Sequence, residues 1–166
     1  MNKIQQTGVG LVEVLVALLV LAIGVLGFVA LQYRAIEVSS EGENRIQAIN
    51  IARDVAEKIR VNRTALTTYA STLAQTNITT LPTPNCFSVY CSTVEKAEFD
   101  SAFVKISAQR IGVSVNMFTC PDVENSRRCI YVAWGETVAV NANGINDCTT
   151  AGLYRPNSTC VVMEVY

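Results

Sequence analysis

The chain has 166 residues, of which half are apolar and 16% are charged, and it contains no histidine. This length suits one domain with an appendage, because a single hydrophobic core usually takes about 100–150 residues. The net charge of −1 excludes binding to a polyanion by bulk electrostatics. The absence of histidine removes the commonest general base and the commonest metal ligand.

The apolar residues that raise the mean hydropathy to +0.29 are concentrated near the N-terminus. Residues 9–31 form an unbroken stretch of 23 residues whose only polar side chain is Glu13. At about 1.5 Å rise per residue, a helix of this length spans the roughly 30 Å hydrocarbon core of a bilayer. The sequence therefore predicts a membrane segment followed by one domain.

Glu13 discriminates between three interpretations of this segment. A secretory signal peptide has an apolar region of only about 7–15 residues and then a small-residue cleavage site, which residues 32–35 do not supply. A plain membrane anchor leaves Glu13 unexplained, since a carboxylate in hydrocarbon costs on the order of 3 kcal/mol and usually marks function. The third interpretation, a segment that is processed and then assembles, gives the carboxylate a role.

The sequence GVGLVEVLVAL, which begins at Gly8, closely resembles the processing site of type IV prepilins and the related pseudopilins. In that family a membrane-embedded peptidase cuts after a glycine that ends a short basic leader, and it methylates the new N-terminus. The resemblance implies that residues 1–8 are the leader, that cleavage falls between Gly8 and Val9, and that Val9 is N-methylated. Glu13 becomes the fifth mature residue. Valine and glycine replace the family's usual aromatic residue and threonine at the new N-terminus.

A buried carboxylate is tolerable only when it is paired, and the nearest candidate for Glu13 is the new amine of Val9. In a fibre the partner amine would come from a neighbouring subunit, so Glu13 is predicted to set the axial register of assembly. Residues 9–31 would then serve as a bilayer anchor before assembly and as the packed core of the fibre afterwards.

The same helix is predicted to continue through residues 32–62 as an amphipathic segment that is loosened near residues 39–42. Surface ion pairs are expected at four- and three-residue spacings, Asp54 with Lys58 and Glu57 with Arg60. The apolar stripe is expected to consist of Ile46, Ile49, Ala52, Val55 and Ile59.

Residues 63–166 are predicted to form the globular domain. Residues 64–85 are expected to be loop with a short helical turn near residues 65–73. A second helix is predicted over residues 92–107, with a strand over 103–108 as the competing interpretation. Its start is indicated by the capping box Ser92 and Glu95, and its apolar face by Phe99, Phe103 and Ile106.

Strands are predicted from alternating apolar residues at 113–117, 129–135 and 160–166. Residues 137–140 are expected to continue the second strand past a bend at Gly135, before a turn-forming stretch. A helical spine followed by an antiparallel meander gives an α+β, pilin-like fold in which the long helix packs on one face of the sheet.

All six cysteines follow the membrane segment, and an even number outside the cytoplasm favours three disulfides. Six cysteines allow fifteen pairings, and proximity along the chain favours Cys86–Cys91, Cys120–Cys129 and Cys148–Cys160. Zinc binding is not expected, because a gap of two to four residues between cysteines does not occur twice and histidine is absent. Thiol redox chemistry is not expected, because the chain has no Cys-x-x-Cys motif.

No catalytic, cofactor-binding or metal-binding residues are predicted. Without histidine only Lys, Asp or Glu could act as a base, and the domain's acids are scattered without a motif. Arg127 and Arg128 form the only basic cluster outside the long helix, and we interpret them as an exposed turn.

Residues 9–27 are similar to the minor pilins of the type IV pilus modification protein (PilV) group, and the segment KIRVNR at 58–63 is similar to a short stretch of the same group. The resemblance implies a pilin subunit of the bacterial inner membrane that faces the periplasm and enters the pilus. Its implied partners are prepilin peptidase, other minor pilins and the major pilin, with no small molecule. The alternatives are a minor pseudopilin of type II secretion and a membrane-tethered periplasmic binding or enzymatic domain.

Overall fold

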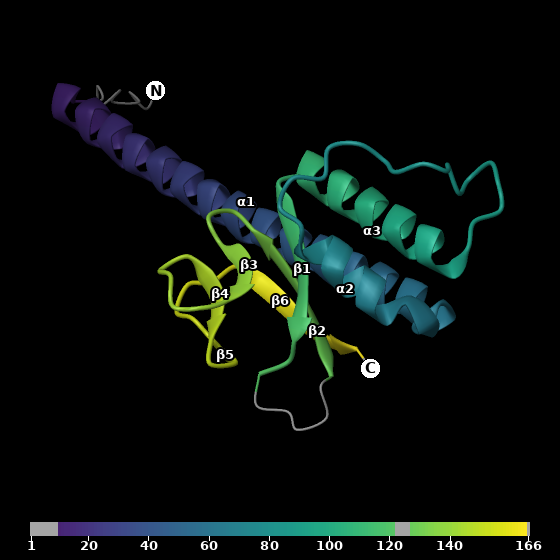
Figure 1. Cartoon of the computed structure of the whole chain (residues 1–166). Coiled ribbons are helices and arrows are strands. Elements are labelled where there is room, and N and C mark those ends of the chain that lie inside the picture. The colour runs from purple at the N-terminus through teal and green to yellow at the C-terminus, as the bar shows by residue number, and fades with distance from the viewer. Residues whose placement is uncertain (1–9, 122–126, 166) are drawn as a thin grey trace, which may run out of the picture. The chain divides into compact units, whose positions relative to one another are not determined.

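The computed structural model describes residues 10–121 and 127–165. The chain divides into two compact units, the first ending at Gly42 and the second running from Glu43 to the C-terminus. One helix, α1 (Leu11–Val61), contributes to both units (Figure 1). The second unit adds three short helical elements and six strands to the last turns of α1.

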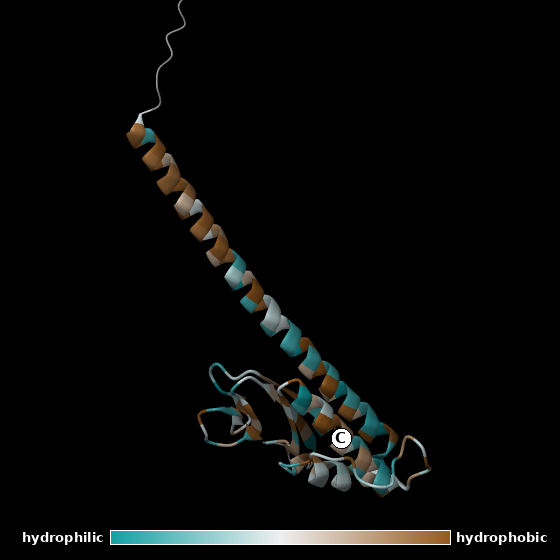
Figure 2. Cartoon of the chain, turned by 90° about the horizontal axis from the view of Figure 1, so that it is seen from above, coloured by the Kyte–Doolittle hydropathy of each residue, from teal (hydrophilic) through white to brown (hydrophobic). Residues whose placement is uncertain are grey.

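Within the described residues, the first unit consists almost entirely of the N-terminal part of helix α1. Its residues are apolar on all sides at the start, and polar residues become frequent further along the helix (Figure 2). The predicted loosening near residues 39–42 is wrong, since the helix passes through Gly42 without a break. A single glycine costs a helix only about 1 kcal/mol, which the hydrogen bonds of the flanking turns offset.

In the second unit, the buried stripe of α1 differs from the predicted stripe at its start, because Ile49 is only half-buried and Ile46 is exposed. Ala48, Ala52, Val55 and Ile59 are almost fully buried, whereas Ile46 is 62% exposed. The small side chains Ala48 and Ala52 lie in the same core as residues of the main sheet. The ion pairs Asp54–Lys58 and Glu57–Arg60 on the outer face are confirmed.

The segment after α1 contains more helix than predicted. A short 3-10 turn, η1 (Arg63–Ala65), leads into α2 (Leu66–Ala74), a full helix of nine residues. Tyr69 and Leu73, four residues apart, are almost fully buried and hold α2 against the core. Tertiary burial therefore stabilises a helix whose threonine-rich sequence favours it only weakly.

The predicted helix after residue 92 is confirmed as α3 (Thr93–Arg110), and the competing strand is wrong. The capping box is present: the amide of Glu95 donates to Ser92 Oγ at 3.3 Å, and the amide of Ser92 donates to Glu95 Oε2 at 2.8 Å. The predicted apolar face is only partly right. Phe99 is buried, but Phe103 remains 39% exposed and packs edge-on against Phe87, with ring centroids 5.3 Å apart.

The capping box gives a pH-dependent prediction. Hydrogen bonds from the amide and the hydroxyl of Ser92 lower the pKa of the Glu95 carboxyl. A lowered pKa in the folded state adds stability that is present above the unfolded pKa and is lost as the pH falls through the folded pKa. We expect Ser92→Ala to lower the free energy of unfolding by about 1 kcal/mol at neutral pH. This difference should shrink in acid, because protonated Glu95 no longer attracts the hydroxyl.

The measurement is denaturant unfolding of the chain in detergent between neutral pH and about pH 3, below the usual glutamate pKa. Ser107→Ala is the matched control, since Ser107 is exposed near the other end of α3. A Ser92→Ala difference that stays constant across this range would contradict the role of the Glu95 carboxylate.

The main sheet is antiparallel and has the strand order β1-β2-β6. It consists of β1 (Val113–Thr119), β2 (Arg128–Trp134) and β6 (Cys160–Val165), at positions that the alternation of apolar residues predicts. One face of this sheet shares a core with the buried stripe of α1 and with α2 and α3. A long N-terminal helix followed by an antiparallel sheet confirms the predicted α+β class.

A second, smaller sheet corrects the predicted meander. Its strands are β3 (Val138–Asn141), β4 (Asp147–Thr150) and β5 (Leu153–Tyr154), and β3 runs parallel to β4. The chain leaves β2 at Gly135, whose φ of +64° lies in the left-handed region that favours glycine. Residues 137–140 therefore do not extend β2. Tyr131, Ala139 and Cys148 belong to a second core on the other face of β2.

Candidate functional site

The first unit presents a continuous apolar surface. Eighteen large apolar side chains between Leu11 and Val38 are 48–78% exposed in the isolated chain. Among the described residues, α1 is the one helix long and apolar enough to cross a membrane. Apolar patches of more than a few hundred Å² mark surfaces that a partner or a membrane covers. This segment is therefore built to be buried in something other than its own domain.

Glu13 lies in the first turn of α1, where its amide donates to the carbonyl of Gly10 at 3.0 Å. The only basic side chain in residues 10–42 is Arg34, which is ion-paired with Glu37 at 2.9 Å. Arg34 lies 21 residues further along the helix, about 30 Å away at 1.5 Å per residue. Glu13 thus has no cation of its own within this stretch. The predicted cleavage residues Gly8 and Val9 lie outside the described residues.

Three disulfides close the second unit, and they join the cysteines that proximity along the chain favours. Cys120–Cys129 connects the facing ends of β1 and β2, where the amide of Cys120 also donates to the carbonyl of Arg127 at 2.8 Å. Cys148–Cys160 connects β4 to β6 and so ties the small sheet to the main sheet. The four cysteines of these two disulfides lie within or next to the second core, where they act as structural bridges.

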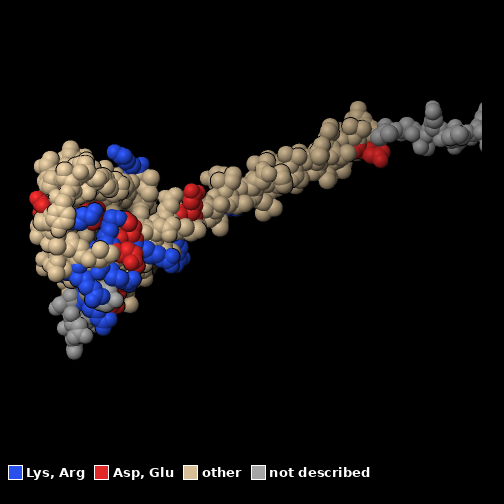
Figure 3. All heavy atoms as spheres, turned by 90° about the vertical axis from the view of Figure 1, so that its right-hand side faces the viewer, with Lys and Arg blue, Asp and Glu red and all other residues tan. Residues whose placement is uncertain are grey.

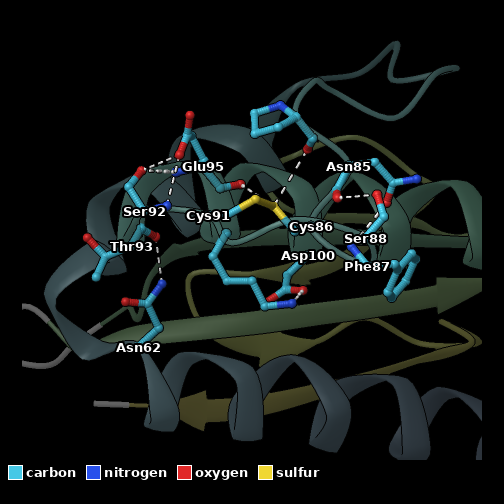
Figure 4. The surroundings of a disulfide bond; sticks show 12 residues. Asn62, Asn85, Cys86, Phe87, Ser88, Cys91, Ser92, Thr93, Glu95 and Asp100 are labelled. Carbon is cyan, nitrogen blue, oxygen red and sulfur yellow. Dashed lines mark hydrogen bonds and ion pairs between the residues drawn. A yellow bond between two sulfur atoms is a disulfide. The ribbon is translucent and has the colours of Figure 1, made fainter.

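The third disulfide, Cys86–Cys91, closes a five-residue step in front of α3 (Figure 4). The loop is ordered by Asn85, whose Oδ1 accepts from the amide of Phe87 at 3.0 Å. Inside the loop, Phe87 packs edge-on against Phe99 with ring centroids 4.9 Å apart. The adjoining cap is tied to the end of α1, because Asn62 Nδ2 donates to the carbonyl of Thr93 at 2.7 Å.

A buried polar cluster joins α1, α2 and α3, and the sequence did not reveal it. Asp100 accepts from Tyr69 Oη at 3.2 Å and pairs with Lys96 at 2.9 Å. Burial, followed by the charge of Asp100, raises the pKa of the Tyr69 hydroxyl well above its usual range. The four-residue spacing of Lys96 and Asp100 was the one available signal. Tyr69 comes from another helix, 31 residues earlier.

A second buried charge closes the C-terminal end of α2. Lys105 Nζ donates to the carbonyls of Leu73 and Gln75, which the end of a helix leaves without intrahelical partners. Burial lowers the pKa of the Lys105 ammonium group. Asp100 and Lys105 both make hydrogen bonds with neighbouring elements, and these bonds offset the cost of burying the two charges. Their burial therefore has a structural explanation that does not require a catalytic role.

The two arginines of the predicted basic cluster contact residues on the two outer strands of the main sheet. Arg127 is ion-paired with Glu164 of β6, and Arg128 Nη1 donates to Thr119 Oγ1 of β1 at 3.1 Å. No group of residues that could hold a metal ion occurs within residues 10–121 and 127–165. The arrangement is suited to packing and display.

Comparison with known proteins gives one match. A family model described as "Tt1218-like: Type IV pilin Tt1218" matches residues 30–102, from the apolar half of α1 into α3. No curated protein and no solved structure matches the chain. The matched region excludes the residues around Gly8 and Glu13, so it is independent of the motif at the start of the chain.

Proposed function

We propose that the chain is a minor pilin that helps to prime assembly of a type IV pilus and contributes to its tip, a proposal that the match of residues 30–102 to a type IV pilin family model supports. The observation that carries this proposal is the exposed apolar helix with the single carboxylate Glu13, joined to a unit closed by three disulfides. The apolar helix can be covered by the same helix of neighbouring subunits in a fibre. The second unit, which three disulfides hold together, can display its loops on the surface of that fibre. A pilin subunit does this work by packing.

The proposed sequence of events begins at the inner membrane. Residues 1–8 are the leader, which prepilin peptidase removes before methylating Val9. Residues 9–31 anchor the subunit and then enter the fibre core, residues 32–62 continue the helix, and residues 63–166 face the periplasm. The three disulfides support a periplasmic location, because such bonds persist in oxidising compartments.

The decisive test is mass spectrometry of the mature N-terminus. The expected product is a chain of 158 residues that begins with N-methylated Val9. A Gly8→Ala variant provides the control and should retain its leader. An uncut Met1, or a cut at any other position, would overturn the pilin assignment.

A pseudopilin of type II secretion would share the same processing, so a deletion strain separates the two systems. Loss of surface pili and twitching with normal exoprotein secretion is expected. If piliation and twitching survive while secretion fails, the chain belongs to the secretion system. The cysteine-bridged unit favours the pilus.

A further inference from the structure

A groove of about 710 Å³ lies between the last turns of α1 and strand β6. Its apolar lining comes from Ala56 on the helix and from Met163 and Val165 on the strand. Three arginines also line it, Arg53 and Arg60 from α1 and Arg127 from the segment before β2. The groove lies entirely within the second unit.

The charges in this groove are not balanced. Glu57 pairs with Arg60 at 2.8 Å, and Glu164 pairs with Arg127. Arg53 has no ion-pair partner among the residues that the structure describes, so the groove holds one unmatched guanidinium. Figure 3 shows how Lys and Arg gather on one side of the globular unit with a few acidic groups between them. A ligand that brings a carboxylate would complete the set of ion pairs.

Strand β6 also has an open edge beside this groove. Among the described residues, β6 pairs with β2 alone. The hydrogen bond from the amide of Trp134 to the carbonyl of Thr159 sets the pattern of this pair, in which the main-chain groups of every second residue of β6 point away from β2. These are Cys160, Val162 and Glu164. The amide of Val162 donates to Tyr154 Oη at 3.0 Å, which blocks that part of the edge. Glu164 lines the groove, and its main chain has no such cap within the described residues.

We propose that this groove binds an extended acidic segment of a neighbouring pilin subunit. The segment adds to the edge of β6 at Glu164, places an apolar side chain against Met163 and Val165, and sets a carboxylate on Arg53. Strand addition provides affinity through main-chain hydrogen bonds, while the arginine selects an acidic sequence. The identity of the partner as a pilin rests on the proposed function.

The test is photocrosslinking in piliated cells with a photoreactive phenylalanine analogue in place of Glu57, an exposed residue of the groove. The same analogue at Ser71, exposed on α2, is the control position. We expect a crosslink from position 57 alone, to another pilin subunit, and the crosslinked peptide should contain Asp or Glu. A crosslink to a nucleic acid, to a protein that is not a pilin, or to a segment without acids would overturn the proposal.

Charge reversal tests the role of the arginine. Arg53→Glu should reduce the crosslink yield at least tenfold. Arg45→Glu changes another exposed arginine of α1, about two turns earlier, and should leave the yield within twofold. Arg53 is exposed, so the thermal unfolding of Arg53→Glu followed by Trp134 fluorescence should match that of the unaltered chain. Equal yields from both variants would overturn the proposal.

This result is separable from the assignment as a pilin. If the chain is cut after Gly8 and recovered in sheared pili, but position 57 gives no crosslink, then the groove proposal alone fails. If the leader is retained and the chain is absent from pili, then the assignment itself fails.

Discussion

Glu13→Ala is expected to leave leader removal intact but to reduce incorporation into sheared fibres at least tenfold. In the proposed register role, Glu13 pairs with the amine of a neighbouring subunit, so the variant would leave that amine buried without its carboxylate, and breaking a buried pair costs about 3–5 kcal/mol. Tenfold corresponds to about 1.4 kcal/mol, so even partial compensation by water leaves a measurable defect. The measurement is the ratio of the subunit in sheared fibres to that in the membrane fraction.

Glu37→Ala is the matched control for this experiment. Glu37 lies on the same helix, but it is exposed and already paired with Arg34. Its removal should change incorporation by less than twofold, since exposed ion pairs are worth little. Normal incorporation of Glu13→Ala would refute the register role of Glu13, while a block in cleavage would move its role to the peptidase step.

Ile59→Ala is expected to lower the free energy of unfolding by about 2–5 kcal/mol, and Ile46→Ala by less than about 0.5 kcal/mol. Both residues belong to the apolar stripe that the sequence predicts. The structure separates them, because Ile59 is 1% exposed in the core beneath the sheet and Ile46 is 62% exposed. Truncating Ile59 leaves a cavity, whereas truncating Ile46 removes atoms from an open surface.

Denaturant unfolding of the mature chain in detergent measures both effects. The single tryptophan, Trp134, is buried in the same core as Ile59 and reports its loss by fluorescence. Equal effects of the two truncations would contradict the observed position of α1 against the main sheet.

Local rules predicted the parts of the fold that local interactions determine. Ser92 and Glu95 satisfy each other's main-chain groups, so the start of α3 is encoded within four residues. Alternation places Val113 and Val115 on the buried face of β1 for a similar reason. Short spacing favoured the observed disulfides, since cysteines close in sequence meet most easily.

The remaining features depend on residues far apart in sequence. Helix α2 exists because Tyr69 and Leu73 find a core that α1 and α3 complete. The small sheet was not predicted, since alternation alone does not show that the chain leaves β2 at Gly135 and pairs β3 with β4. The stripe of α1 differs from expectation because Ala48 is buried in the core, and an alanine gives a weak signal in an amphipathic pattern.

The candidate functional residues also differ in whether nearby sequence or distant residues reveal them. Glu13 stands out from sequence alone, because one acid in an apolar stretch is conspicuous. The groove beside β6 was not predicted, as it requires Arg53, Arg127 and Glu164 to converge from three separate segments. Single charges on a helix surface give no indication of which strand edge lies next to them.

The connection between β2 and β6, residues 135–159, leaves the main sheet and returns to it at nearly the same point. The amide of Trp134 donates to the carbonyl of Thr159 at 3.0 Å, and Thr159 Oγ1 donates to the carbonyl of Trp134 at 2.5 Å. These two hydrogen bonds therefore hold the start and the end of the connection together at the edge of the main sheet. Exposed positions on this connection, such as Ile145 and Leu153, are free to change with little cost to the scaffold. Subunits of this kind can thus acquire new surfaces while their spine and sheet stay the same.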